Sequence, residues 1–170
     1  GMSPVSESRL FGRDQLLSDM TDWLISGDSI ALSAQGMAGV GKTRLAMALT
    51  NSNEILGHFS DGILWAGLGP DADVMRHLAT WADFVGIDVT GIPTEEERSK
   101  VVKNAIAHRK MLLVIDDAWD LNAANLLKCG GPNCAHLLTT RNQEIAHAFA
   151  GPQGTRNIPA LEESAAFEML

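Results

Sequence analysis

One short segment constrains the fold more than any other, and its sequence is Gly36-Met37-Ala38-Gly39-Val40-Gly41-Lys42-Thr43. It has the spacing of glycine, four residues, glycine, lysine and a hydroxyl residue. The run before it, residues 29–33, predicts a strand, and the pattern after it predicts a helix over residues 42–51. Glycines let the backbone wrap closely around an anion, with N–H groups pointing inward at a helix N-terminus. The segment therefore predicts a phosphate-binding loop.

The last two residues of this segment supply the chemistry that glycines cannot. Lys42 is expected to reach the β- and γ-phosphates of a nucleotide as a point charge. The Thr43 hydroxyl is expected to ligate Mg²⁺. The alternative is a glycine-rich turn without a ligand, but the position between a strand and a helix favours the phosphate loop.

Short apolar runs alternate with helical patterns along the whole chain of 170 residues. Alternation of this kind predicts an α/β fold: a P-loop NTPase three-layer sandwich with a mainly parallel, about five-stranded sheet and helices on both faces. The expected strands are residues 29–33, 62–68, 112–115, 135–138 and 156–158.

Helical spacing and capping residues place the expected helices. The pattern predicts helices over residues 14–25 and 42–51, and another after Pro70 with Val74, Leu78, Trp81 and Val85 on one face. Thr94, with Glu97 three residues later, predicts a capping box. That helix is expected to end with the basic residues 108–110, which suits the helix dipole. A last helix is expected over 162–170, and because the chain stops inside it, we expect the natural protein to be longer.

Two acids follow a buried strand at Asp116 and Asp117. The unbroken apolar run before them indicates a strand covered on both faces. A carboxylate at its end is costly unless a cation or hydrogen bonds satisfy it, so Asp116 is expected to hold Mg²⁺, mostly through water. Asp117 has two interpretations: it orients or deprotonates an attacking water, or it caps a helix that starts at Ala118.

A positively charged side chain, that of Arg141, follows the next expected strand. The sequence Leu137-Leu138-Thr139-Thr140-Arg141 places polar residues and an arginine directly after a buried run. In a parallel sheet this edge is the ligand-binding side, so Arg141 is a candidate sensor of the γ-phosphate. The alternative is an ordinary surface arginine.

Composition excludes several other classes of protein. The net charge of −8 disfavours direct binding of this segment to nucleic acid, since phosphates would be repelled. No apolar run reaches the roughly 18 residues that a membrane span needs. Cys129 and Cys134 have four residues between them and only His136 nearby, too few ligands for structural zinc. We expect reduced thiols, one in a loop and one entering a strand, in a cytoplasmic protein.

Taken together, four segments resemble the NB-ARC family of the STAND P-loop ATPases, most closely its apoptotic-adaptor and bacterial signalling members. Phe11-Gly12-Arg13-Asp14 is similar to the family's amino-terminal motif, and the octapeptide 36–43 is similar to its phosphate loop. Asp116-Asp117-Ala118-Trp119 resembles its strand-end signature, and residues 137–141 resemble its sensor segment. Residues 59–67, with Trp65 in the predicted strand, are also similar to the corresponding stretch of the family. Arg44 departs from the threonine usual in plant resistance proteins.

The resemblance implies a division of the chain and a set of site residues. Residues 1–13 would contact the nucleotide base, and residues 14–170 would form the P-loop NTPase domain. Lys42, Asp117 and Arg141 would be catalytic, and Thr43 and Asp116 would hold the metal. The nucleotide would be bound by Phe11, Gly12, Arg13, Gly36, Met37, Ala38, Gly39, Val40, Gly41, Lys42, Thr43 and Arg44.

The resemblance also implies a function, a regulatory ATP/ADP switch with Mg²⁺ and slow ATP hydrolysis inside a larger signalling or transcription-regulatory protein. The lid and winged-helix domains of the family would lie beyond Leu170. ATP would release the full-length protein for self-oligomerisation, with no role for a membrane.

Three other functions compete with the switch. A metabolic P-loop kinase needs an arginine-rich lid, and residues 142–154 contain no arginine. A GTPase needs an Asn-Lys-x-Asp segment, which is missing; Asp88-Val89-Thr90-Gly91 matches a different GTPase pattern but is expected to be a turn. An ATPase-like scaffold or DNA-regulator module would depend on a DNA-binding domain elsewhere in the parent protein.

Overall fold

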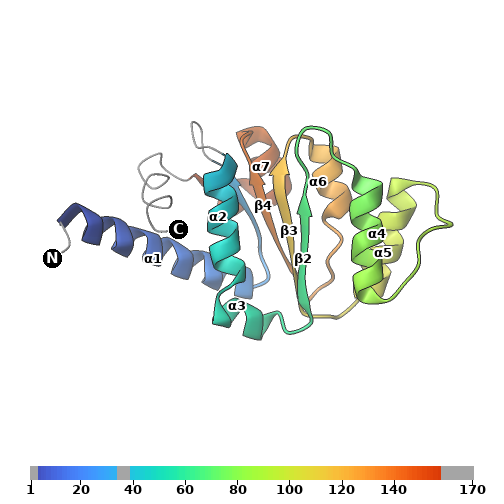
Figure 1. Cartoon of the computed structure of the whole chain (residues 1–170), viewed down its shortest axis with the longest axis horizontal. Helices are drawn as coiled ribbons and strands as arrows, with labels where there is room; N and C mark the ends of the chain where they lie inside the picture. The colour runs from blue at the N-terminus through green and yellow to red at the C-terminus, as the bar shows by residue number, and fades with distance from the viewer. Residues whose placement is uncertain (1–3, 34–38, 158–170) are drawn as a thin grey trace.

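A five-stranded sheet lies between two layers of helices in the computed structural model, which describes residues 4–33 and 39–157 (Figure 1). All its strand pairs are parallel, and the strand order is β2-β3-β4-β1-β5. The predicted three-layer α/β fold is confirmed. The strands are β1 (Ser29–Ser33), β2 (Gly62–Gly67), β3 (Met111–Ala118), β4 (Ala135–Thr140) and β5 (Thr155–Asn157).

Each face of the sheet has its own group of helices and its own apolar cluster. Neighbouring residues of a strand point to opposite faces. In β3, Leu112 and Val114 pack with α1 (Pro4–Ile25), α2 (Gly39–Thr50) and α3 (Asn53–His58). Leu113 and Ile115 belong to the other cluster. That second face is covered by α4 (Val74–Val85), α5 (Glu95–Ile106), α6 (Leu121–Leu127) and α7 (Gln143–Gly154).

The first helix is longer than predicted. The expected start at Asp14 is wrong, because α1 runs over Pro4–Ile25 and includes the backbone of Phe11, Gly12 and Arg13. Proline is favoured in the first turn of a helix, where its fixed φ suits the helix and no N–H partner is needed. A glycine inside a helix costs about 1 kcal/mol relative to alanine, too little to end one. Within the described residues, no helix is long and apolar enough to cross a membrane.

Other boundaries also differ from the predictions. Helix α2 begins at Gly39 and not at Lys42, and α5 ends at Ile106, so the basic residues 108–110 lie beyond it. Tertiary contacts extend β3 and β4 past their apolar runs, whereas β2 ends before Leu68. Helices α3 and α7 have no predicted counterpart, because α3 is short and α7 is interrupted at Gly151, whereas α6 begins at Leu121 and not at Ala118. The expected helix 162–170 and the end of the fifth strand at Ile158 lie outside the described residues.

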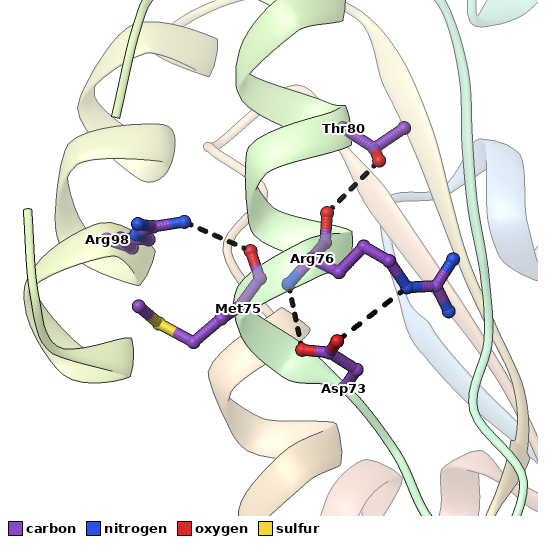
Figure 2. A network of polar contacts seen from close by, with 5 residues as sticks. All are labelled: Asp73, Met75, Arg76, Thr80 and Arg98. Carbon is purple, nitrogen blue, oxygen red and sulfur yellow. Dashed lines mark hydrogen bonds and ion pairs between the residues drawn. The ribbon is translucent and has the colours of Figure 1, made fainter. Parts of the chain in front are cut away.

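Helices α4 and α5 are joined by polar contacts near their N-terminal ends (Figure 2). Asp73 caps α4 by accepting the N–H of Arg76 at 3.1 Å. The Arg76–Asp73 ion pair, at 3.8 Å, is exposed to solvent and therefore stabilises the fold little. Arg98 of α5 donates to the carbonyl of Met75 at 3.3 Å, which ties the two helices together. The segment 88–91 between them contains the predicted turn.

The register of the sheet shifts next to the paired acids. Between Ile115 and Ala118 the pairing with β4 is irregular, so Asp116 and Asp117 together oppose Thr139. Such a bulge re-aims side chains at the end of a strand. Asp117 takes a left-handed conformation with a φ of 58°. The Thr139 hydroxyl holds both acids: it accepts the N–H of Asp117 at 2.8 Å and donates to Asp116 Oδ1 at 2.5 Å.

We predict that Thr139→Val lowers the free energy of unfolding by about 1 to 3 kcal/mol, because the Asp117 N–H and the Asp116 carboxylate each lose a partner. Thr139→Ser keeps the hydroxyl and is the matched control, expected to lose less than about 1 kcal/mol for one methyl group. Urea denaturation followed by tryptophan fluorescence measures both variants. Equal losses in the two variants would show that packing of the methyl group, and not the hydroxyl, stabilises this bulge.

A second buried polar group lies near the opposite end of β4. His136 Nε2 accepts the N–H of Gly130 at 3.0 Å, and its ring meets the edge of Phe149. Burial lowers the pKa of His136 from 6.5 to about 4, and the nearby Lys128 and Lys103 act in the same direction. The imidazole is therefore neutral in the folded protein at neutral pH.

The two cysteines flank the Gly130 loop. Cys129 and Cys134 are both buried free thiols, the first in a loop and the second directly before β4, as predicted. Burial raises the pKa of Cys129 to about 12, so its thiol stays protonated and weakly nucleophilic.

We predict that His136 makes stability depend on pH in the acidic range. Because its pKa is lower in the folded state than in the unfolded state, its contribution is complete above about pH 6.5 and is lost as the pH falls to about 4. The full loss is on the order of 3 kcal/mol. Comparing unfolding free energies of wild type and His136→Gln across this range isolates the effect, since carboxylates titrate in both. A constant difference between the two would contradict the prediction.

Candidate nucleotide-binding site

The strand order places a topological switch point between β1 and β4 at the carboxyl edge of the sheet. The two strands are neighbours, but the chain leaves β1 toward β2 at one edge and leaves β4 toward β5 at the other. Ligands of open parallel sheets bind where connections diverge in this way. Residues 34–43 follow β1, and Arg141 follows β4. Two of the segments that the sequence singles out therefore follow the two strands of the switch point.

The described end of the predicted phosphate loop is the first turn of α2. Gly36, Met37 and Ala38 lie outside the described residues, whereas Gly39, Val40 and Gly41 belong to the helix. The unpaired N–H groups of a first helical turn and the helix dipole attract anions. Lys42 is almost fully buried, at 1% exposure, in this same turn.

The side chains of Thr43 in α2 and Asp116 in β3 are in direct contact although the two residues are far apart in the chain. The Thr43 hydroxyl lies 2.8 Å from Asp116 Oδ2 and 3.1 Å from Oδ1, in hydrogen-bonding geometry. Asp116 is only 7% exposed and also accepts the hydroxyl of Thr139. Two hydroxyls and one carboxylate, from α2, β3 and β4, thus gather at the start of the phosphate-loop helix.

Asp117 does not cap the next helix, so that interpretation is wrong. Helix α6 begins at Leu121, and its cap is Asp120, whose carboxylate accepts the N–H groups of Asn122 and Ala123. A helix cannot start at Ala118 because this residue is still paired with β4. The bulge leaves Asp117 half-buried at the strand end.

Trp119 contacts the two candidate catalytic residues of the strand ends. Its indole N–H donates to Asp117 Oδ1 at 3.1 Å. The guanidinium carbon of Arg141 lies 5.9 Å from the centre of its ring, within the range of a cation–π contact. The indole is 51% exposed, which is unusual for so large an apolar group.

Two hollows adjoin Trp119. One, of about 610 Å³, is lined by Ala118, Trp119, Arg141, Asn142, Gln143 and Glu144. The other, of about 490 Å³, lies between the loop after β2 and the start of α6, and Trp119 lines it too. Both are open to solvent.

The structure thus forms two groups from the predicted residues. Thr43 and Asp116 are in direct contact, and Asp117 and Arg141 are joined through Trp119. Arg44 follows Thr43 in α2 and is partly buried. The side chains of Phe11 and Arg13 lie outside the described part of α1.

Two residues of the site carry no role in the sequence interpretation. Thr139 is one, although it lies within residues 137–141, which resemble the family's sensor segment. Trp119 is the other, and its only signal is its place directly after the two acids and an alanine. The contact of Thr139 with Asp116 and that of Trp119 with Arg141 both depend on the register between β3 and β4.

Comparison with known proteins identifies the family of this chain. The chain matches the NB-ARC domain family over residues 13–170. It is 30% identical over 169 residues to an Arabidopsis thaliana protein that carries a disease-resistance name, covering 92% of this chain and 19% of that protein. It is 28% identical over 140 residues to apoptotic protease-activating factor 1 of Rattus norvegicus, covering 77% of this chain and 11% of that protein.

A bacterial relative shows a similar degree of likeness. Regulatory protein AfsR of Streptomyces griseus is 30% identical over 155 residues, covering 86% of this chain and 16% of its own length. The chain therefore spans less than a fifth of the length of each of these three relatives. Because the family match extends over nearly all of the chain and the fold agrees with it, the protein belongs to the NB-ARC family of nucleotide-binding P-loop NTPase domains.

Proposed function

We propose that this domain is an ATP/ADP-dependent regulatory switch that hydrolyses ATP slowly. The observation that carries the proposal is the contact between Thr43, at the start of the phosphate-loop helix, and the buried Asp116. The candidate phosphate-binding turn and a buried carboxylate thus lie together at the carboxyl edge of the sheet. Nucleotide phosphates with a bound cation match both groups: the anionic phosphates suit the N-terminal turn of α2, and the cation suits the carboxylate.

The contact between Thr43 and Asp116 also suits Mg²⁺. Neighbouring oxygen ligands of an octahedral Mg²⁺ lie about 2.9 Å apart, given Mg–O distances of about 2.0–2.1 Å. The 2.8 Å between Thr43 Oγ1 and Asp116 Oδ2 is close to this value, and both donors are the hard oxygens that the ion prefers. When bound, the ion would neutralise charge that develops on the phosphates. Thr43 and Asp116, the latter directly or through water, would hold it.

The remaining polar residues supply the other parts of a hydrolysis reaction. Lys42 would place its ammonium group on the β- and γ-phosphates. Asp117 would orient a water whose oxygen bonds to the γ-phosphorus, while the bond to the bridging oxygen breaks and ADP leaves. The carboxylate of Asp117 would accept the proton of this water, and Arg141 would stabilise negative charge on the γ-phosphate.

The switch itself would depend on parts of the parent protein beyond this domain. Phe11, Gly12 and Arg13 are proposed to contact the adenine end of the nucleotide. C-terminal lid and winged-helix domains would enclose ADP in a closed state, and exchange for ATP would release the protein for oligomerisation. The names of the relatives, which include an apoptotic factor and a bacterial regulator, support an intracellular signalling role. A nucleotide can drive such a switch only if it binds the two states with different affinity.

We predict that the domain binds Mg-ATP and Mg-ADP in preference to Mg-GTP. Lys42→Ala is expected to weaken this binding at least about tenfold, because it removes the ammonium group that would contact the phosphates. Lys100→Ala, on the exposed side of α5, is the matched control and is expected to bind as wild type does. Calorimetric titration measures the affinities, and thermal unfolding checks that each variant is folded. Retained affinity in Lys42→Ala would contradict the phosphate-loop assignment, and a preference for GTP would contradict the adenine assignment.

We predict that Asp116→Asn removes the gain in nucleotide affinity that Mg²⁺ provides. The asparagine can still accept hydrogen bonds from the Thr43 and Thr139 hydroxyls, so the fold should be kept. The negative charge that would attract the metal ion is lost. Titrations of ADP with Mg²⁺ and with a chelator give the comparison. Asp120→Asn is the control, because asparagine is an equally good helix cap. An undiminished effect of Mg²⁺ in Asp116→Asn would place the ion elsewhere.

A further inference from the structure

An exposed tryptophan contacts two residues of opposite charge at the carboxyl edge of the sheet. The indole N–H of Trp119 is bound to the Asp117 carboxylate, and the face of its ring meets the Arg141 guanidinium. The first contact uses the edge of the indole and the second its π-surface. One side chain therefore makes a directional contact with each charge.

The acid and the arginine come from neighbouring strands. Asp117 is in the bulge of β3, and Arg141 directly follows β4, so both side chains leave the same edge of the sheet. A carboxylate and a guanidinium that come within reach of each other can pair and neutralise each other's charge. Within residues 39–157, no ion pair joins Asp117 to Arg141. The indole instead contacts both.

The exposure of Trp119 does not follow from packing alone. Leaving about half of an indole in water forgoes much of the free energy that its burial would provide. The left-handed backbone of Asp117 is likewise unfavourable for a residue other than glycine. Features of this kind persist where the surrounding contacts enforce them, and they gather at functional sites.

We propose that Trp119 is a positioning residue, which orients the Asp117 carboxylate through its N–H and keeps the Arg141 guanidinium apart from it on the ring, so that both charges remain available to one nucleotide. This inference rests on the proposed function and adds a role for a residue that touches neither phosphate nor metal in that mechanism. Without the indole N–H, Asp117 is free to turn away from the water or to pair with Arg141. The effect falls on turnover and not on nucleotide binding.

The hydrogen bond is tested in the free protein by NMR. The four tryptophans give separate indole N–H signals, and Trp119→Phe identifies the one from residue 119. Asp117→Asn is expected to shift this signal and to leave those of the other three in place. An unmoved Trp119 signal overturns the inference, and it does so whether or not the domain hydrolyses ATP.

The functional role is tested by ATP hydrolysis. Trp119→Phe keeps an aromatic ring but loses the N–H, and it is expected to lower kcat about tenfold with less than about a twofold change in KM or in the affinity for Mg-ADP. Trp65→Phe, a half-buried tryptophan of the neighbouring β2, receives the same substitution and is expected to retain wild-type turnover. Parallel losses of kcat, ADP affinity and thermal stability in Trp119→Phe would show a merely structural residue.

A double-mutant cycle separates action through Asp117 from independent action. In the Asp117→Asn background, Trp119→Phe is expected to have little further effect on kcat, because its partner carboxylate is already gone. Multiplicative effects of the two substitutions would overturn the inference. Absence of hydrolysis by wild type, together with an Asp117-dependent Trp119 signal, would instead refute the slow ATPase and leave the positioning contact in place.

Discussion

The carboxylate of Asp116 lies between the hydroxyls of Thr43 and Thr139, and these contacts join α2, β3 and β4. A buried carboxylate is costly without hydrogen bonds or a cation, so its partners must be in place for the fold to be stable. The same contacts position Thr43 at the start of the phosphate-loop helix and Thr139 opposite the bulge. The geometry of the candidate site therefore depends on how this one charge is satisfied.

The bulge at Asp116 and Asp117 takes the second of these two acids out of the regular alternation of the strand. In a regular strand, successive side chains would point to opposite faces of the sheet. Here Asp116 faces Thr43 and the α2 side, whereas Asp117 is turned at the strand end toward Trp119. Thr139 stabilises the irregular backbone by accepting the N–H of Asp117. One hydroxyl thus fixes the positions of both acids.

Family membership and site geometry support the proposed switch in different ways. The family match and the fold indicate a nucleotide-binding domain. The convergence of Thr43 and Asp116 adds a place where a cation and phosphates could bind together. The relatives are several times longer than this chain, so the chain corresponds to only a part of each of them. The domain would contribute the nucleotide-dependent step.

The sequence by itself determined the fold class and the position of two acids at a strand end, and it predicted the phosphate loop, because these depend on patterns that are local in the chain. The spacing of 36–43, the apolar run before Asp116 and the helical face of α4 are each contained in a short segment. Periods of 2.0 and 3.6 residues identify strands and helices without knowledge of their neighbours.

Only the tertiary structure decided which strands are neighbours and in what register. The place of β4 between β3 and β1 brings Thr139 to Asp116, and the register shift makes Asp117 part of a bulge and not a helix cap. Likewise, Trp119 gains its role only when Arg141 from the next strand lies over its ring. These contacts join residues far apart in the chain, and their formation depends on the packing of whole elements, which no local pattern encodes.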